Sequence, residues 1–196
     1  MAPLHRTPGT RGTLDILERF NARYLERSGD GLVGIQATRA LPAFSVAGIE
    51  IRDRGEAPTP IRQGIDFYYK ERRKIEKQIQ RDVYLGLMSP RETVPRAYLP
   101  SIQVGPDSIV PPEFTVRGAG PFPYGVFRYM GPHDPRDIDP YELGALWDHV
   151  FRTWKPALRA ASDAGTAFER IDFAKCSRQY CECDLCYPIR GLDEVT

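Results

Sequence analysis

Residues Phe122 to Trp154 read FPYGVFRYMGPHDPRDIDPYELGALWDHVFRTW and predict a strand, a turn and a helix in direct succession. Tyr124–Met130 is rich in aromatic and β-branched residues, and Gly131-Pro132 ends the strand because proline has no amide to donate. Asp139-Pro140 then starts a helix with an N-cap carboxylate and a proline at the first helical position. Apolar side chains recur at helical spacing and give this helix one aromatic face: Leu143, Leu146, Trp147, Val150, Phe151, Trp154 and Leu158.

The residues before this stretch predict the same order of elements. From Leu32 to Ile51 a period-two pattern of β-branched residues predicts a strand, interrupted at Leu41-Pro42. Thr59-Pro60 then starts a helix with a cap and a proline. Its buried face is expected to carry Ile61, Ile65, Tyr68, Ile75 and Ile79. Further strands are expected at Val83–Met88, Ala97–Val104, Ala167–Phe173 and Cys181–Ile189.

The two halves therefore look like a tandem repeat. Thr59-Pro60 corresponds to Asp139-Pro140, and Leu99-Pro100 corresponds to Tyr187-Pro188. Two strand-helix-strand-strand units predict an α+β fold, in which two long helices lie on one face of an antiparallel sheet with a central cleft between them. The predicted division is a mobile segment with one helix at 1–31, repeat one at 32–112, repeat two at 113–190 and a tail at 191–196.

Composition favours a protein of the cytoplasm. The 196 residues include 27 basic and 26 acidic side chains, so the net charge of +1 gives no reason to expect direct contact with nucleic acid. There is no signal peptide and no apolar stretch long enough to span a bilayer, so no membrane partner is expected. The basic residues of the helix that starts at Thr59-Pro60 are interpreted as a solvent-exposed face.

Several of these motifs resemble the GyrI-like effector-binding domain of AraC- and MerR-type transcription regulators, which also occurs as a stand-alone protein. The motifs are YGVFRYMGPH (124–133), the helix with Trp147, FERID (168–172) and DLCYPI (184–189). The resemblance covers about residues 33 to 190 and implies transcription regulation and multidrug recognition. It implies an aromatic cleft that binds lipophilic or cationic organic molecules, here in the stand-alone form.

The resemblance also implies a carboxylate on the closing strand. The family has a glutamate there, and in this chain the position falls to Asp184, whose side chain is one methylene shorter. In an aromatic cleft Asp184 would balance a cation, with each ring face adding about 0.5–2 kcal/mol. The alternative is a strand carboxylate paired with a neighbouring arginine. The predicted ring residues are Trp147, Phe151, Trp154, Tyr68, Tyr69, Tyr98 and Tyr187.

Hydrolysis of a reactive small molecule is the alternative function for the same cleft. Some stand-alone members hydrolyse reactive cyclopropane compounds, and Asp184 beside Tyr68 or Tyr69 is able in principle to activate water. No motif selects a catalytic residue, and no cofactor is expected. The expected partners are a small organic ligand and a separate regulatory protein, with the chain as monomer or dimer.

Four cysteines lie close together as Cys176-x4-Cys181-x-Cys183-x2-Cys186. Four thiolates suit a tetrahedral soft metal. However, an extended strand points Cys181 and Cys183 to one face and Cys186 to the other, so such a site would require the strand to bend. A thiolate metal site, a redox pair and small buried thiols are the three interpretations, and the last is preferred.

Overall fold

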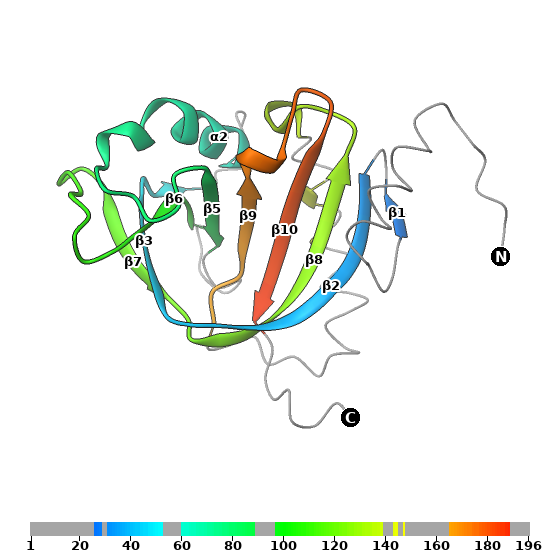
Figure 1. Ribbon diagram of the computed structural model, residues 1–196, viewed down its shortest axis with the longest axis horizontal. Coiled ribbons are helices and arrows are strands. Elements are labelled where there is room, and N and C mark those ends of the chain that lie inside the picture. Colours follow the sequence, from blue (N-terminus) through cyan, green and yellow to red (C-terminus); the bar gives the residue numbers. More distant parts are fainter. Residues whose placement is uncertain are drawn as a thin grey trace, which may run out of the picture.

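The computed structural model of the protein describes residues 26–28, 31–52, 60–88, 97–138, 143, 144, 147 and 165–188. These residues form one antiparallel ten-stranded sheet with the order β1-β2-β8-β10-β9-β5-β6-β3-β7, and β4 lies beside β6 (Figure 1). The strands are β1 (Glu26–Ser28), β2 (Gly31–Leu41), β3 (Phe44–Gly48), β4 (Ile51–Arg52), β5 (Val83–Met88), β6 (Ala97–Val104), β7 (Thr115–Ala119), β8 (Phe122–Gly131), β9 (Phe168–Asp172) and β10 (Cys181–Pro188). The described residues also include helix α2 (Pro60–Lys70) and the 3-10 turns η1 (Arg72–Lys74), η2 (Pro135–Asp137) and η4 (Phe173–Lys175).

The two faces of the central strands carry different clusters of buried side chains. The helix-side cluster joins α2 to alternate residues of the sheet and contains Ile61, Ile65, Tyr68, Tyr84, Tyr98, Phe127, Tyr129, Ile138, Leu143, Trp147, Ile171, Cys181, Cys183, Leu185 and Tyr187. The far-side cluster contains Val46, Val83, Leu85, Leu87, Leu99, Ala119, Tyr124, Val126, Phe168 and Cys186. Because strand side chains alternate between faces, neighbours in sequence enter different clusters.

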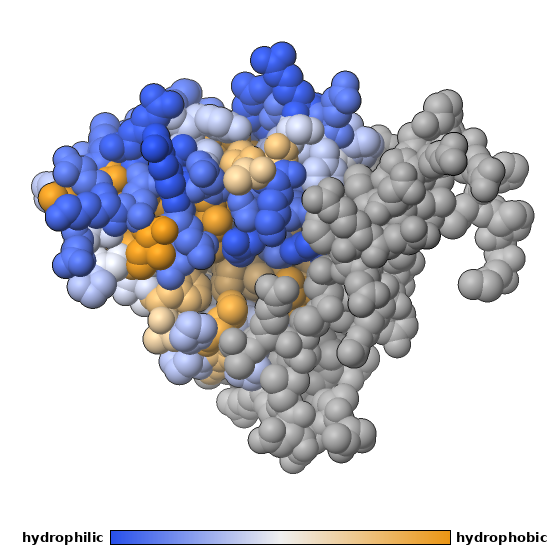
Figure 2. Space-filling view, in the orientation of Figure 1, coloured by the Kyte–Doolittle hydropathy of each residue, from blue (hydrophilic) through white to orange (hydrophobic). Residues whose placement is uncertain are grey.

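Helix α2 lies over β5 and β6, with the buried residues Ile61, Ile65 and Tyr68 toward the sheet (Figure 1). Its outer side and the nearby turns are largely hydrophilic, whereas hydrophobic residues gather beneath them (Figure 2). This distribution fits a helix that is held by packing of one apolar face on the sheet.

Helix α2 is shorter than the sequence pattern predicts. It ends at Lys70, and although Ile75 is buried, Ile79 is 53% exposed. The Glu76 amide donates to the Ile109 carbonyl at 3.1 Å, so the backbone pairs with a distant segment instead of with the preceding helical turn. A single helix through Ile79 is therefore wrong.

The predicted strands correspond to β2, β3, β5, β6, β8, β9 and β10, so an antiparallel α+β sheet is confirmed. In the second predicted helix Leu143, Gly144 and Trp147 are helical, and the rest lies outside the described residues. The N-terminal helix and the tail also lie outside them, except that Glu26–Ser28 pairs with β2 as a strand instead of ending a helix. Within the described ranges, no helix combines the length and apolarity needed to cross a membrane.

Candidate functional site

Glu169 is a buried carboxylate at the centre of the sheet. It belongs to β9, where it pairs with Leu185 of β10 on one side and Gly86 of β5 on the other. Only 3% of the residue is exposed. Its side chain lies on the same face as Ile171, two residues along the strand, and therefore faces the helix-side cluster.

Two neutral donors hold the Glu169 carboxylate. The Tyr98 hydroxyl donates to Oε2 at 2.7 Å, and the Trp147 indole Nε1–H donates to Oε1 at 2.8 Å. The Tyr84 and Tyr98 hydroxyl oxygens lie 2.5 Å apart, which extends the chain of hydrogen bonds under α2. The Glu169 carboxyl group thus joins β9 to Tyr98 of β6 and to Trp147, and Tyr84 of β5 is linked to it through Tyr98.

Two glycines leave room for these hydroxyls. A Cβ at Gly86 would lie 1.9 Å from the Tyr98 oxygen, and a Cβ at Gly64 of α2 would lie 2.1 Å from the Tyr84 oxygen. Since real Cβ atoms do not approach so closely, any larger residue at either position must displace a tyrosine. Gly86, directly opposite Glu169 in the sheet, allows Tyr98 to reach the carboxylate.

Burial raises the pKa of Glu169 from the ordinary 4.5 to about 7, although the hydrogen bonds from Tyr98 and Trp147 act in the opposite direction. The carboxyl group is therefore poised between its neutral and ionised forms near neutral pH. Burial and the Glu169 charge both raise the pKa values of Tyr84 and Tyr98 well above the usual range. Both hydroxyls consequently keep their protons.

Four of the predicted ring residues, Tyr68, Tyr98, Trp147 and Tyr187, belong to the helix-side cluster. Of these, Tyr98 and Trp147 contact the Glu169 carboxylate. Tyr68 stacks on Phe173 with ring centroids 4.0 Å apart, and the Arg72 Cζ atom lies 4.2 Å from the same ring centre. Burial raises the pKa of Tyr68 to about 12.

Other predicted ring residues lie elsewhere. Tyr69 is 43% exposed and touches the edge of Phe173, at the rim of the cluster. Phe151 and Trp154 lie outside the described residues.

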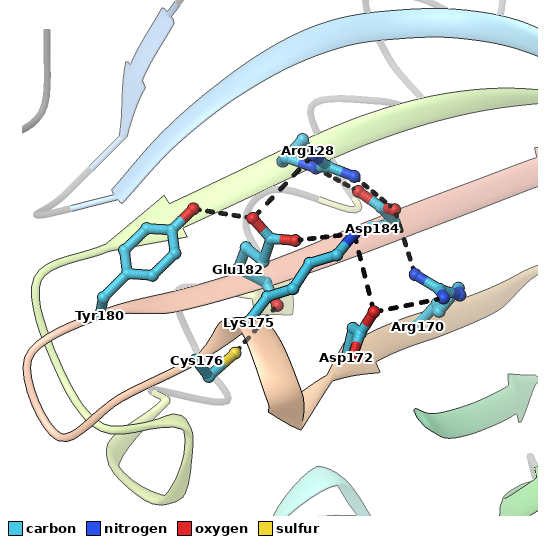
Figure 3. Close-up of polar contacts among 8 residues, drawn as sticks. All are labelled: Arg128, Arg170, Asp172, Lys175, Cys176, Tyr180, Glu182 and Asp184. Atoms are coloured by element: carbon cyan, nitrogen blue, oxygen red, sulfur yellow. Dashed lines mark hydrogen bonds and ion pairs between the residues drawn. The ribbon is translucent and has the colours of Figure 1, made fainter. Parts of the chain in front are cut away.

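Asp184 does not lie with these rings. Its two oxygens accept from Nε and Nη2 of Arg128, at 2.6 and 2.8 Å, on the other face of β10 (Figure 3). Arg170 approaches Asp184 to 3.9 Å, and Glu182, on the same face, accepts from the Tyr180 hydroxyl at 2.8 Å (Figure 3). The charge of Asp184 is thus already compensated, as in the arginine-paired alternative from the sequence.

Sequence reasoning missed Glu169, although the motif FERID (168–172) contains it. The available signal was the period of the strand, because Glu169 shares a face with Ile171. A carboxylate on an otherwise apolar face of a central strand is uncommon and requires hydrogen-bond donors or an opposite charge nearby.

The cysteines do not form a four-thiolate site. Cys181 and Cys183 belong to the helix-side cluster, whereas Cys186 belongs to the far-side cluster, so the predicted opposite facing is confirmed. Within the described ranges, no group of three or more cysteine, histidine or acidic side chains is arranged to hold a metal ion. All four thiols are free.

No family model matches the chain. No curated protein matches it either. Several solved structures resemble it at low identity, and two of them are described first. A proposed bacterial transcription regulation protein from Staphylococcus aureus MU50 has a TM-score of 0.51 and 13% identity, with 79% of this chain and 97% of that chain covered. SAV2435 bound to tetraphenylphosphonium has a TM-score of 0.52 and 16% identity, with 80% of this chain and 94% of that chain covered.

The likeness is one of fold. An integron cassette protein from Vibrio cholerae has a TM-score of 0.49 and 18% identity, with 81% of this chain and 99% of that chain covered.

Proposed function

We propose that this protein is an effector-binding domain that holds a small lipophilic or aromatic cation against Glu169. The observation that carries the proposal is the contrast between two buried carboxylates. Asp184 contacts the guanidinium of Arg128, whereas the groups that hydrogen bond to Glu169 are a phenol and an indole, which are both neutral. A buried carboxylate ionises more readily when a positive charge accompanies it, and a ligand is able to supply that charge.

The aromatic surroundings support the same class of ligand. Tyr98 and Trp147 contact the carboxylate, Tyr68 and Tyr187 belong to the same helix-side cluster, and aromatic faces attract cations by about 0.5–2 kcal/mol each. Trp147 covers Glu169, so the ligand must displace its indole N–H to reach Oε1. Phe151 and Trp154, which follow Trp147 in sequence, remain predicted ring residues of the same site.

The fold supports the position of the site. In the order β8-β10-β9-β5-β6-β3, the strands β8, β9 and β10 of the second half mirror the strands β3, β5 and β6 of the first half, and the halves meet at β9 and β5. This order is the one expected from two joined strand-helix-strand-strand units. Glu169 lies on β9, at the junction where a cleft between two such units is expected.

The solved structure of similar fold supports the ligand class. The tetraphenylphosphonium bound to SAV2435 is an aromatic, lipophilic cation. A regulatory role with a separate DNA-binding partner, as in the resemblance to GyrI-like domains, is the wider context that we propose for such binding.

The test is a titration with tetraphenylphosphonium, followed by tryptophan fluorescence, at pH 8, where Glu169 is mostly ionised. Truncating one partner of a buried charge pair costs about 2–5 kcal/mol, so Glu169→Gln is expected to weaken binding by about 30-fold or more. Glu71→Gln, which removes a partly exposed carboxylate directly after α2, is the matched control and should bind like the wild type. Equal affinities of Glu169→Gln and the wild type would exclude Glu169 as the counter-charge.

A hydrolase is the second candidate, because a carboxyl group with a pKa of about 7 suits general acid or base catalysis at neutral pH. Glu169 would activate water, and the Tyr98 hydroxyl, backed by Tyr84, would supply a proton donor. Incubation with a reactive cyclopropane compound tests this role. Catalytic product formation that Glu169→Gln and Tyr98→Phe both abolish would support it, and binding without turnover would exclude it.

A further inference from the structure

The hairpin between β9 and β10 places Cys176 opposite Cys181. At its tip, the Ser177 amide donates to the Tyr180 carbonyl at 2.8 Å, and the Tyr180 amide donates to the Ser177 carbonyl at 3.4 Å. Ser177 and Tyr180 are therefore a hydrogen-bonded antiparallel pair. One residue outward on each side of the turn come Cys176, directly after η4, and Cys181, the first residue of β10.

In an antiparallel ladder the pair that follows a hydrogen-bonded pair is not hydrogen bonded, and its side chains approach most closely. Such a pair has Cα atoms about 4.5 Å apart, which lies within the range that a disulfide bridges. The Cys176 backbone is extended, with φ −93° and ψ 165°. Its amide donates to the Phe173 carbonyl at 3.3 Å, away from Cys181, as this register requires.

Lys175, the last residue of η4, makes an ion pair with Glu182 at 3.9 Å (Figure 3). The Cys176 Sγ atom lies 3.9 Å from the Glu182 carbonyl oxygen (Figure 3). These contacts hold Cys176 against the start of β10, next to Cys181.

The two thiols differ in access. Cys181 is fully buried, whereas Cys176 is partly exposed. A hydrogen bond from the Cys181 thiol lowers the pKa of Cys176, and it raises the pKa of Cys181. Cys176 is consequently the thiol that a small oxidant reaches first and the one that ionises more readily.

We propose that Cys176 and Cys181 are a reversible dithiol and disulfide pair that exchanges with low-molecular-weight disulfides of the glutathione class. The Cys176 thiolate attacks one sulfur of the small disulfide, which forms a mixed disulfide and releases one small thiolate. The Cys181 thiolate then attacks the Cys176 sulfur and releases the second small thiolate. The protein loses two electrons and two thiol protons, and the small disulfide is reduced to two thiols.

The remaining cysteines are excluded from this exchange. Cys183 is buried in the helix-side cluster, and Cys186 lies in the far-side cluster, on the other face of β10. Neither is opposite Cys176 in the hairpin register. The pair is distinct from the proposed cation site, because it requires neither Glu169 nor a bound ligand.

The test equilibrates the full chain, first reduced, with glutathione disulfide and then counts free thiols under denaturing conditions. We expect the four thiols to fall to two, in a monomer, with peptide mapping that joins Cys176 to Cys181. Retention of four thiols, or a bond that maps to Cys183 or Cys186, would overturn the proposal.

Two variants separate the roles of the thiols. Cys181→Ser is expected to stop at a mixed disulfide between Cys176 and glutathione, because the second thiolate is missing. The double variant Cys183→Ser with Cys186→Ser is expected to form the hairpin disulfide like the wild type. Internal disulfide formation in Cys181→Ser would contradict the assignment, and the peptide map of the wild type decides the question if a variant does not fold.

Discussion

The raised pKa of Glu169 predicts that the unliganded protein loses stability as the pH rises from 4.5 to about 7. Between these values the folded carboxyl group holds a proton that the unfolded chain has released. The free energy of unfolding therefore falls by about 1.4 kcal/mol per pH unit across this window. The total loss from this group is about 3 kcal/mol, and the contribution is constant above the folded pKa.

Glu169→Gln removes this titration and keeps the shape of the side chain. The variant is expected to keep the unfolding free energy that the wild type loses as the pH rises. The difference in unfolding free energy between the two proteins should therefore change by about 3 kcal/mol from pH 4.5 to pH 8. Urea unfolding at several pH values measures it. Each protein is compared with itself across the pH range, so any fixed cost of the amide cancels.

Glu71→Gln is the control for the removal of a carboxylate, because Glu71 is half-exposed at the end of α2. It is expected to follow the wild-type pH profile. If the profiles of Glu169→Gln and the wild type run parallel, the carboxyl group of Glu169 is not perturbed, and the electrostatic argument for the cation site fails.

Three further predictions concern stability. Asp184→Asn is expected to cost about 3–5 kcal/mol in urea unfolding, because it removes the carboxylate that accepts two hydrogen bonds from the buried guanidinium of Arg128; a cost below 1 kcal/mol would contradict the buried pair. Gly86→Ala is expected to cost about 1–3 kcal/mol by displacing the Tyr98 hydroxyl. Gly118→Ala, where a Cβ meets nothing within 4 Å, should be nearly neutral, and equal costs at the two glycines would refute the close contact. The hairpin disulfide closes a short loop and is expected to stabilise the oxidised protein by about 2 kcal/mol, a gain that thermal unfolding of the two redox forms would show.

Local sequence patterns predicted the strands well, because proline, glycine and β-branched residues act on the backbone directly. The end of α2 was not predictable in this way. Ile75 and Ile79 continue the helical spacing, but pairing of Glu76 with Ile109, which is distant in sequence, redirects the chain. The spacing of apolar residues over a few helical turns does not reveal such pairing with a distant segment.

The candidate site was predicted in part. The ring residues Tyr68, Tyr98, Trp147 and Tyr187 lie in one cluster, but the carboxylate beside them is Glu169 instead of Asp184. Strand periodicity already separates Asp184 from Tyr187, since residues three apart on a strand point to opposite faces. The partner strands of β9 were not predictable, because the order of strands depends on packing across the whole sheet.

The most direct measurement of the proposed function is the number of protons released when tetraphenylphosphonium binds at pH 6. Calorimetric titration in two buffers of different ionisation enthalpy gives this number. With a pKa of about 7, Glu169 is mostly protonated at pH 6, and a bound cation should drive off close to one proton. The wild type is expected to release that proton and Glu169→Gln none, whereas wild-type binding without proton release would contradict a counter-charge at Glu169.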